Sequence, residues 1–158
     1  MNTAIHTAIQ TFTGNSLDEI VREGGDWQWV LSQNRAKTQQ YLVCCSSVGI
    51  NRASGFLVGK IESVDLYTKP GEKERFIIRI SEWAKINIPD LWTRSRKRNP
   101  VHYTSLKELK IELSDLKFEK ISKVKPLPSD SLTIAEAKAG LAKHYEVSPD
   151  NIEITIKY

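Results

Sequence analysis

The stretch of sequence that decides the fold reads GFLVGKIESVDL at residues 55–66, YTKPGEKE at 67–74 and RFIIRI at 75–80. The first and third pieces are apolar runs of strand length and are rich in β-branched residues. The piece between them contains the pair Pro70-Gly71, which is typical of a tight turn. Together the three pieces predict a β-hairpin in the middle of the chain.

Short segments on both sides of this hairpin also have the pattern of β-strands. Alternating or continuously apolar residues predict strands at 27–31, 41–45, 116–121 and 152–156. The stretch 87–100 holds two prolines and a dense group of cations, and it predicts a long ordered loop.

Three capping boxes of the form S/T-x-x-E predict where helices begin. Ser16 precedes a short helix over residues 17–23, and Ser105 opens a helical turn. Thr133 precedes a helix that runs to Tyr145 and carries apolar residues on one face.

Strands without long helices between them argue against a doubly wound parallel sheet. A closed barrel removes exposed sheet edges, so we expect an α+β fold built on a small, mostly antiparallel β-barrel with short helices and a C-terminal helix–strand appendage. The predicted organisation is an N-terminal helical segment (1–25), the barrel (26–122), a proline-containing linker (123–130) and the helix–strand unit (131–158).

The composition narrows the class of protein. The 158 residues are 40% hydrophobic, enough for one domain with a small appendage. The sequence contains no apolar run of the roughly 18 residues that a membrane span needs, and the N-terminus has no signal-peptide pattern. Cys44 and Cys45, the two cysteines, are adjacent and predict free thiols. We therefore expect a cytoplasmic protein without a membrane partner.

Motifs for catalysis or for cofactors are missing from the sequence. We find no Walker loop, no dinucleotide fingerprint, no zinc-protease motif and no nucleophile elbow. The three histidines are scattered, without a second ligand at metal-binding spacing. The sequence therefore predicts no catalytic constellation, no metal and no cofactor.

The net charge of +4 is unevenly distributed. Residues 1–30 carry a balance of −3, residues 31–110 of +8 and residues 111–158 of −1. The densest cationic run, Arg94-Ser95-Arg96-Lys97-Arg98, lies in the basic middle part. Such a region attracts a polyanion, although a solvated basic loop would have the same composition.

All four tryptophans also lie in this part of the chain, between Trp27 and Trp92. Aromatic faces beside cations are what small β-folds use to bind unpaired bases, because bases stack on the rings and cations neutralise phosphates. We expect at least two of the four tryptophans to belong to the core instead, which leaves one or two aromatic residues to line a pocket.

Three pieces of sequence carry a resemblance to a known family. They are WVLSQN (29–34), GFLVGKIESV (55–64) and NPVHYTSLKEL (99–109), in this order. Together they resemble the PUA-like superfamily, particularly its EVE and ASCH branches, over about residues 26–121. The resemblance implies a pseudobarrel with a pocket for a modified or flipped base or for an RNA element. It also implies that Trp27 or Trp29, Asn34 and Tyr103 line that pocket.

The first hypothesis is therefore a nucleic-acid-binding module that recognises a modified or flipped base, or an RNA element, of DNA or RNA. Its candidate residues, which share an aromatic, amide or cationic side chain, are Trp27, Trp29, Asn34, Arg35, Trp92, Arg94, Arg96, Lys97, Arg98, His102 and Tyr103.

Two alternatives remain open at this stage. One is a non-catalytic protein–protein adaptor that binds its partner through residues 131–158. The other is a small metal-independent nuclease whose acid–base groups are Lys85, Arg98, His102 and Tyr103.

Overall fold

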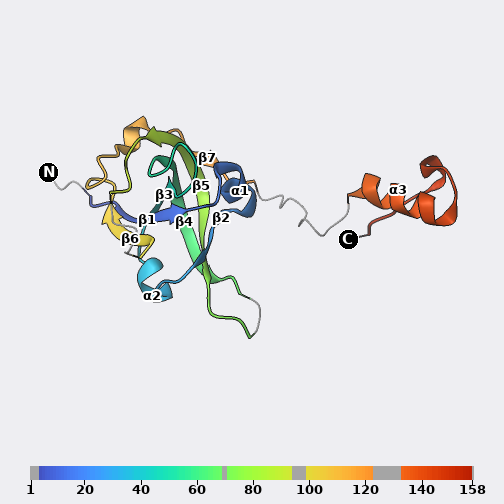
Figure 1. Ribbon diagram of the computed structural model, residues 1–158, viewed down its shortest axis with the longest axis horizontal. Helices are drawn as coiled ribbons and strands as arrows, with labels where there is room; N and C mark the ends of the chain where they lie inside the picture. Colours follow the sequence, from blue (N-terminus) through green and yellow to red (C-terminus); the bar gives the residue numbers. More distant parts are fainter. Residues whose placement is uncertain (1–3, 69–70, 94–98, 123–132, 158) are drawn as a thin grey trace. The chain divides into compact units, whose positions relative to one another are not determined.

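The predicted hairpin is present and contains the two longest strands of the described chain. Strand β4 (Gly55–Leu66) and strand β5 (Phe76–Ile88) pair antiparallel along most of their length. The computed structural model describes residues 4–68, 71–93, 99–122 and 133–157, and it divides into a first unit, Met1–Val124, and a second unit, Lys125–Tyr158 (Figure 1).

The remaining elements are short. The other strands are β1 (Thr7–Thr13), β2 (Gly25–Trp29), β3 (Tyr41–Ser46), β6 (Val101–Ser105) and β7 (Glu119–Lys120). The helices are α1 (Leu17–Glu23), α2 (Gln33–Ala36), α3 (Ile134–Tyr145) and the 3₁₀ turns η1 (Leu113–Asp115) and η2 (Pro149–Asn151).

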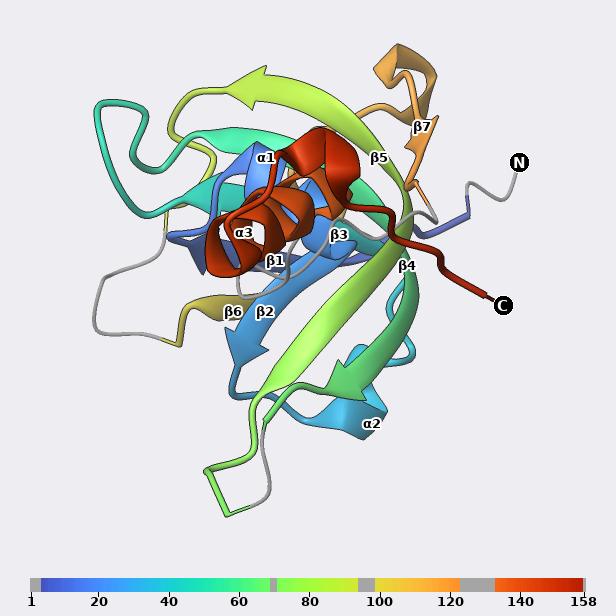
Figure 2. The same ribbon diagram turned by 90° about the vertical axis from the view of Figure 1, so that its right-hand side faces the viewer.

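The strands form one mixed, mostly antiparallel sheet in the order β2-β5-β4-β3-β1-β6, with β7 added to β5. Only β1 and β3 pair parallel among the described strands. The sheet curls strongly, and in Figure 2 the ribbon of β5 bends along its length. The hydrogen-bonded path ends at β2 and β6, so the described sheet is a half-barrel within the expected α+β fold.

The N-terminal segment differs from its prediction. Helix α1 has the predicted bounds, and both bonds of the capping box between Ser16 and Glu19 are present. Residues 7–13, however, form β1, which lies between β3 and β6, so the segment is not simply helical. The sequence hides this strand because Ala8 to Thr11 are buried on both faces, and a strand covered on both sides has no polar alternation.

Two predicted strands differ from the structure: one is shorter than expected and the other is not formed. The strand expected at 116–121 is reduced to β7, and residues 152–156 form no strand in the described chain. The helical turn expected at Ser105 is present, since the Leu109 N–H donates to the Ser105 carbonyl and the Glu108 N–H to the Ser105 hydroxyl, both at 3.2 Å. A strand needs a partner in hydrogen-bonding register, and an alternating pattern alone does not supply one.

Helix α3 of the second unit is confirmed. Thr133 caps it through a complete capping box with Glu136, and Glu146 ends it in the left-handed conformation at φ 54°. Only Ala142 is buried among the described residues of this helix.

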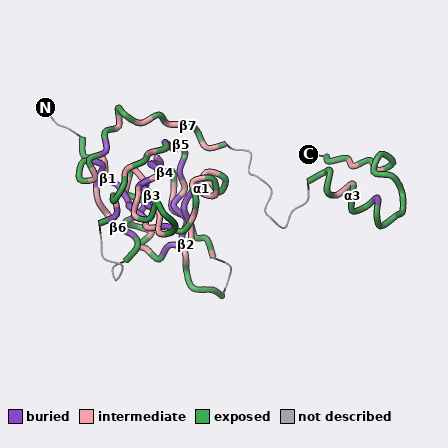
Figure 3. Tube along the Cα trace, turned by 45° about the horizontal axis from the view of Figure 1, so that its top comes forward, coloured by how far each residue is buried: buried purple, intermediate pink, exposed green. Residues whose placement is uncertain are grey.

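The buried residues of the first unit lie mostly on the strands (Figure 3), and their side chains form two clusters on opposite faces of the sheet. The inner cluster includes Trp29 from β2 and Val101 from β6, together with Ile9 and Leu42 from the strands between. β2 and β6 lie at opposite ends of the sheet path, so only a curled sheet brings their side chains into one cluster. The outer cluster contains Ala8, Val43, Val58, Leu106 and Ile111.

A buried carboxylate links β2, at one end of the sheet path, to β1, the strand next to the other end. Asp26 of β2 is fully buried and accepts hydrogen bonds from Thr11 (2.8 Å) and Thr13 (3.0 Å) of β1 and from the Asn15 amide (2.8 Å). The Cys44 thiol of β3 lies 3.7 Å from the same carboxylate. Because β2 and β1 are not neighbours in the sheet, these bonds join strands that the backbone ladder leaves apart.

Candidate functional site

The two early tryptophans belong to the interior rather than to an open pocket. Trp29 is 8% exposed within the inner cluster, and Trp27 is half-buried against it. Gln28 between them has φ 72°, and the pairing of β2 with β5 shifts register there. Asp26 and Trp29, three residues apart, pair with Ile78 and Phe76, two residues apart, so the bulge returns Trp29 to the face on which Asp26 lies. The Trp29 Nε1–H is buried without a hydrogen-bond partner among the described residues.

Trp92 lies elsewhere, on the outer side of β1. It is 6% exposed and stacks on Phe12 with ring centroids 5.1 Å apart and planes 4° apart. The Arg52 guanidinium lies 5.0 Å from the centroid of the same Phe12 ring. The prediction that at least two tryptophans are core residues is confirmed by Trp29 and Trp92. The cations Arg94, Arg96, Lys97 and Arg98 lie outside the described residues.

His102 and Tyr103 are neighbours on β6, and they point to opposite faces of the sheet. His102 Nδ1 lies 3.2 Å from the Gln10 side-chain oxygen, and the Gln10 amide donates to the Leu91 carbonyl at 3.1 Å. Tyr103 instead packs against the inner cluster. Of the residues proposed for the nuclease, these two therefore do not converge on one side of the strand.

Arg35 and Tyr103 are the two predicted residues that the fold brings together. The guanidinium carbon of Arg35 lies 3.9 Å from the centroid of the Tyr103 ring, a close cation–π contact. Arg35 is exposed, whereas Tyr103 is half-buried and its hydroxyl is buried without a partner in the described chain. Asn34, also predicted, is exposed one residue earlier on α2.

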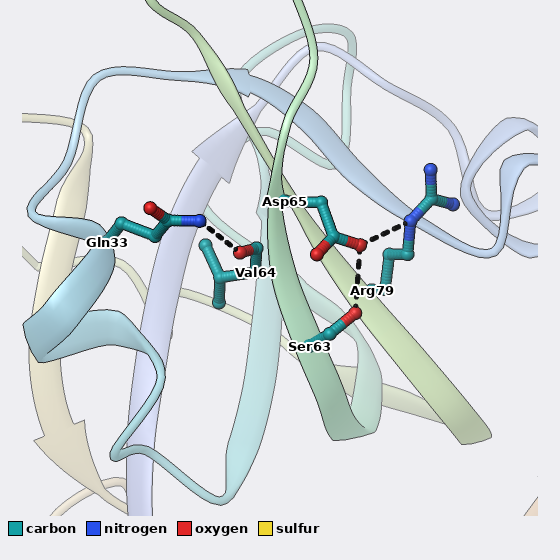
Figure 4. A network of polar contacts seen from close by, with 5 residues as sticks. All are labelled: Gln33, Ser63, Val64, Asp65 and Arg79. Carbon is teal, nitrogen blue, oxygen red and sulfur yellow. Dashed lines mark hydrogen bonds and ion pairs between the residues drawn. The ribbon is translucent and has the colours of Figure 1, made fainter.

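Helix α2 holds Arg35 in this position although it has only four residues. Gln33 donates its side-chain amide to the Val64 carbonyl of β4 at 2.8 Å, and Figure 4 shows this side chain reaching from the helix to the strand. The Ser32 hydroxyl caps the helix, and Ala36 is fully buried in the inner cluster. The helix is thus tied to the sheet at β4.

The same hairpin carries a second polar group on its other side. In Figure 4 the Asp65 carboxylate points away from α2 and binds Arg79 and Ser63, each at 2.9 Å. This ion pair braces β4 against β5, and because it is only partly buried it contributes little to stability on its own.

Arg35 and Tyr103 lie on the wall of an open groove of about 1250 Å³. Its lining comes from residues 4–6 before β1, from α2 and Gln39, from the end of β6 and from the turns up to Ser114. The charged or ionisable residues on this lining, besides Arg35 and Tyr103, are His6, Lys107, Glu108, Lys110 and Glu112. Trp27, Trp29 and Trp92 do not line it, so the predicted residues do not form a single pocket.

The titration of the buried groups limits the chemistry of the site. Burial raises the pKa of the Tyr103 phenol above its ordinary value of 10.0, and the Arg35 charge offsets part of that rise. The phenol is therefore neutral at physiological pH and is not a base. Burial also raises the pKa of Cys45 to about 11, so this thiol is not a reactive nucleophile.

No group of three or more His, Cys, Asp or Glu side chains that could hold a metal occurs among the described residues. Within the same residues, no helix has the length and apolarity of a membrane span. What the groove does offer is an aromatic face beside cations, which suits a planar or anionic ligand.

Sequence reasoning missed His6, Lys107 and Lys110, which line the groove. Lys107 and Lys110 lie in the segment 99–109 or directly after it, so their spacing beyond Tyr103 was the available signal. His6 could not be found in this way, because its position depends on the pairing of β1 with β6.

Comparison with known proteins yields no match: no family model fits the chain, and neither curated proteins nor solved structures show a significant similarity.

Proposed function

We propose that this protein is a nucleic-acid-binding module of PUA-like architecture, and that it recognises a modified or flipped base, or an RNA element, at the groove beside Tyr103. The observation that carries the proposal is the Arg35 guanidinium 3.9 Å above the Tyr103 ring on the wall of an open groove. The curled half-barrel and the sequence resemblance support the PUA-like part of the proposal.

The Arg35–Tyr103 pair marks a face on which a base can stack. A guanidinium is planar, and it occupies the position above the ring that a nucleobase would take. Arg35 is exposed, so its side chain can swing aside while α2 stays tied by Gln33. The base would then stack on Tyr103, and the displaced guanidinium would bind the neighbouring phosphate. Stacking of this kind is worth roughly 1–3 kcal/mol per base.

The test is a titration of a labelled single-stranded oligonucleotide, followed by fluorescence anisotropy over a series of salt concentrations. Tyr103→Phe keeps the ring and should bind as the original protein does, whereas Tyr103→Leu should weaken binding roughly tenfold or more, because it loses the stacking face. Arg35→Ala should also weaken binding, while Arg22→Ala on α1 is the matched control, an exposed arginine that does not line the groove.

Two results would reject the proposal. One is the absence of any oligonucleotide binding at low salt. The other is binding that Tyr103→Leu and Arg35→Ala leave unchanged, provided that thermal unfolding shows both variants folded.

A second candidate function, the adaptor, is supported by one observation in the second unit. Several large apolar side chains of this unit are exposed, namely Ile134, Leu141, Tyr145, Val147 and Ile156. Apolar side chains in this number favour a protein contact. Leu141→Asp should abolish capture of a protein partner under this alternative and leave oligonucleotide binding unchanged.

A further inference from the structure

We infer that the groove binds an extended single strand of nucleic acid, whose phosphates contact Lys107 and Lys110 while one base stacks on Tyr103. The inference rests on the proposed function and names the form of nucleic acid and two further binding residues.

The size of the groove is the first argument for a chain-like ligand. Sites for single small molecules measure roughly 300–1,000 Å³ and enclose most of their ligand. This groove measures about 1250 Å³ and is open to solvent. It therefore has room for several nucleotides in a row, and a lone nucleotide would leave much of it empty.

Lys107 and Lys110 lie on a backbone segment that burial and hydrogen bonds hold in place. Leu106 and Ile111, on either side of them, are 1% and 7% exposed in the outer cluster. The Leu106 N–H donates to the His6 carbonyl and the Ile111 N–H to the Leu106 carbonyl, both at 2.9 Å. This segment is thus pinned to the sheet on both sides of the lysines.

Both lysines are exposed, and neither has a carboxylate within ion-pair distance among the described residues. Their charges are therefore available to phosphate groups of a ligand in the groove.

The acidic residues of the groove restrict where the phosphates of a bound strand can run, because the groove surface is not uniformly positive. Glu108 accepts a hydrogen bond from the Thr104 hydroxyl at 2.7 Å, which turns its carboxylate toward β6. Glu112 is the N-cap residue of η1, and its side chain makes no capping hydrogen bond. A strand that passes Lys107 and Lys110 gains attraction, whereas a path over Glu112 meets repulsion. The phosphates are thereby directed to the lysines.

The burial of Tyr103 disfavours a paired duplex at this point. Its ring is half-buried and packs against the inner cluster, so a base must leave its partner to reach the exposed face. In a single strand, or in an unpaired loop, no base pair has to be broken for this contact. We therefore expect unpaired nucleic acid to bind more tightly than a duplex of the same length.

The experiment measures binding of oligothymidylates and oligouridylates of one to eight nucleotides, and of a duplex, to the full chain. Affinity should rise with length up to at least about four nucleotides and exceed that of the duplex. In the variant with both Lys107→Ala and Lys110→Ala, the slope of log K against log salt should become shallower by about 1.4, since each phosphate contact on a single strand contributes about 0.7. The variant with Lys73→Ala and Lys117→Ala changes two exposed lysines away from the groove and is the matched control for charge.

The outcomes separate this inference from the proposed function. Oligonucleotide binding that depends on Tyr103 but has the original salt slope in the Lys107/Lys110 variant overturns the inference and leaves the proposed function standing. Saturation by a mononucleotide, or tighter binding of the duplex, also overturns the inference alone. Failure of every oligonucleotide to bind rejects both.

Discussion

The interior around Asp26 and the groove around Tyr103 differ in whether the buried polar group of each has hydrogen-bond partners. Asp26 is fully buried, and three side-chain donors from β1 and the loop after it satisfy its carboxylate. The Tyr103 hydroxyl is buried without a partner, although the ring borders an open groove. Buried polar atoms are almost always paired in stable cores. The comparison therefore links the Asp26 network to stability, whereas the Tyr103 wall is the surface on which the proposed ligand would bind.

The largest effect on stability is expected at Trp29, which belongs to the interior. Trp29→Ala should lower the free energy of unfolding by about 3–5 kcal/mol, because it removes a large ring from the inner cluster. Trp27→Ala should cost clearly less, since that ring is half-buried. Chemical denaturation of both variants measures the difference. Equal and small losses would show that Trp29 is not a core residue and would reopen its role in binding.

A smaller effect, with a characteristic pH dependence, is expected at Asp26. Asp26→Asn should cost at least about 1–3 kcal/mol, because the new amide presents donors to Thr13 and Asn15, which are themselves donors in this network. Desolvation raises the pKa of Asp26 above its ordinary 3.8 in the folded protein, so the folded state holds the proton more tightly than the unfolded state.

The contribution of that proton to the free energy of unfolding is fully present below pH 3.8. It is lost as the pH rises through the folded-state pKa of Asp26. The neighbouring Cys44 does not titrate in this range, since burial raises its pKa well above 9.0. The free energy of unfolding of the original protein, measured relative to Asp26→Asn, should therefore fall with rising pH in this window. A difference that stays constant or rises would contradict the account of the network.

The smallest effect on stability is expected at the helix that joins the two regions. Gln33→Ala removes one partly buried bond to the Val64 carbonyl and should cost about 1 kcal/mol. It should also weaken oligonucleotide binding, because α2 no longer holds Arg35 beside Tyr103, where the displaced guanidinium would bind the phosphate next to the stacked base. Asn34→Ala is the matched control on the same helix, and it should change stability by no more than about 0.5 kcal/mol. Thermal unfolding and anisotropy measure the two effects separately.

Local signals in the sequence were sufficient for the elements that local chemistry specifies. The hairpin of β4 and β5 follows from its turn and apolar runs, and α1 and α3 follow from capping boxes that are present in the structure. The strand β1 could not be found, because burial on both faces removes the alternation that marks a strand. The curl of the sheet likewise depends on contacts between distant segments, such as Asp26 with Thr11.

The same reason explains what was found of the site. Arg35 and Tyr103 were predicted separately, and their contact exists because the curled sheet brings α2 to β6. Trp92 was grouped with them because it shares their composition and charge environment, yet it stacks on Phe12 on the other face. Composition predicts which kinds of side chain a site uses, whereas the fold decides which of them share a surface.

The most direct test of the central claim is photo-crosslinking of a single-stranded oligonucleotide that contains one 5-iodouracil, a base that crosslinks to the aromatic ring on which it stacks. Mass spectrometry of the digested protein then identifies the crosslinked residue. The account predicts a crosslink to Tyr103 that persists in Tyr103→Phe and disappears in Tyr103→Leu. A crosslink at Trp92 or within the second unit, unchanged in Tyr103→Leu, would contradict it.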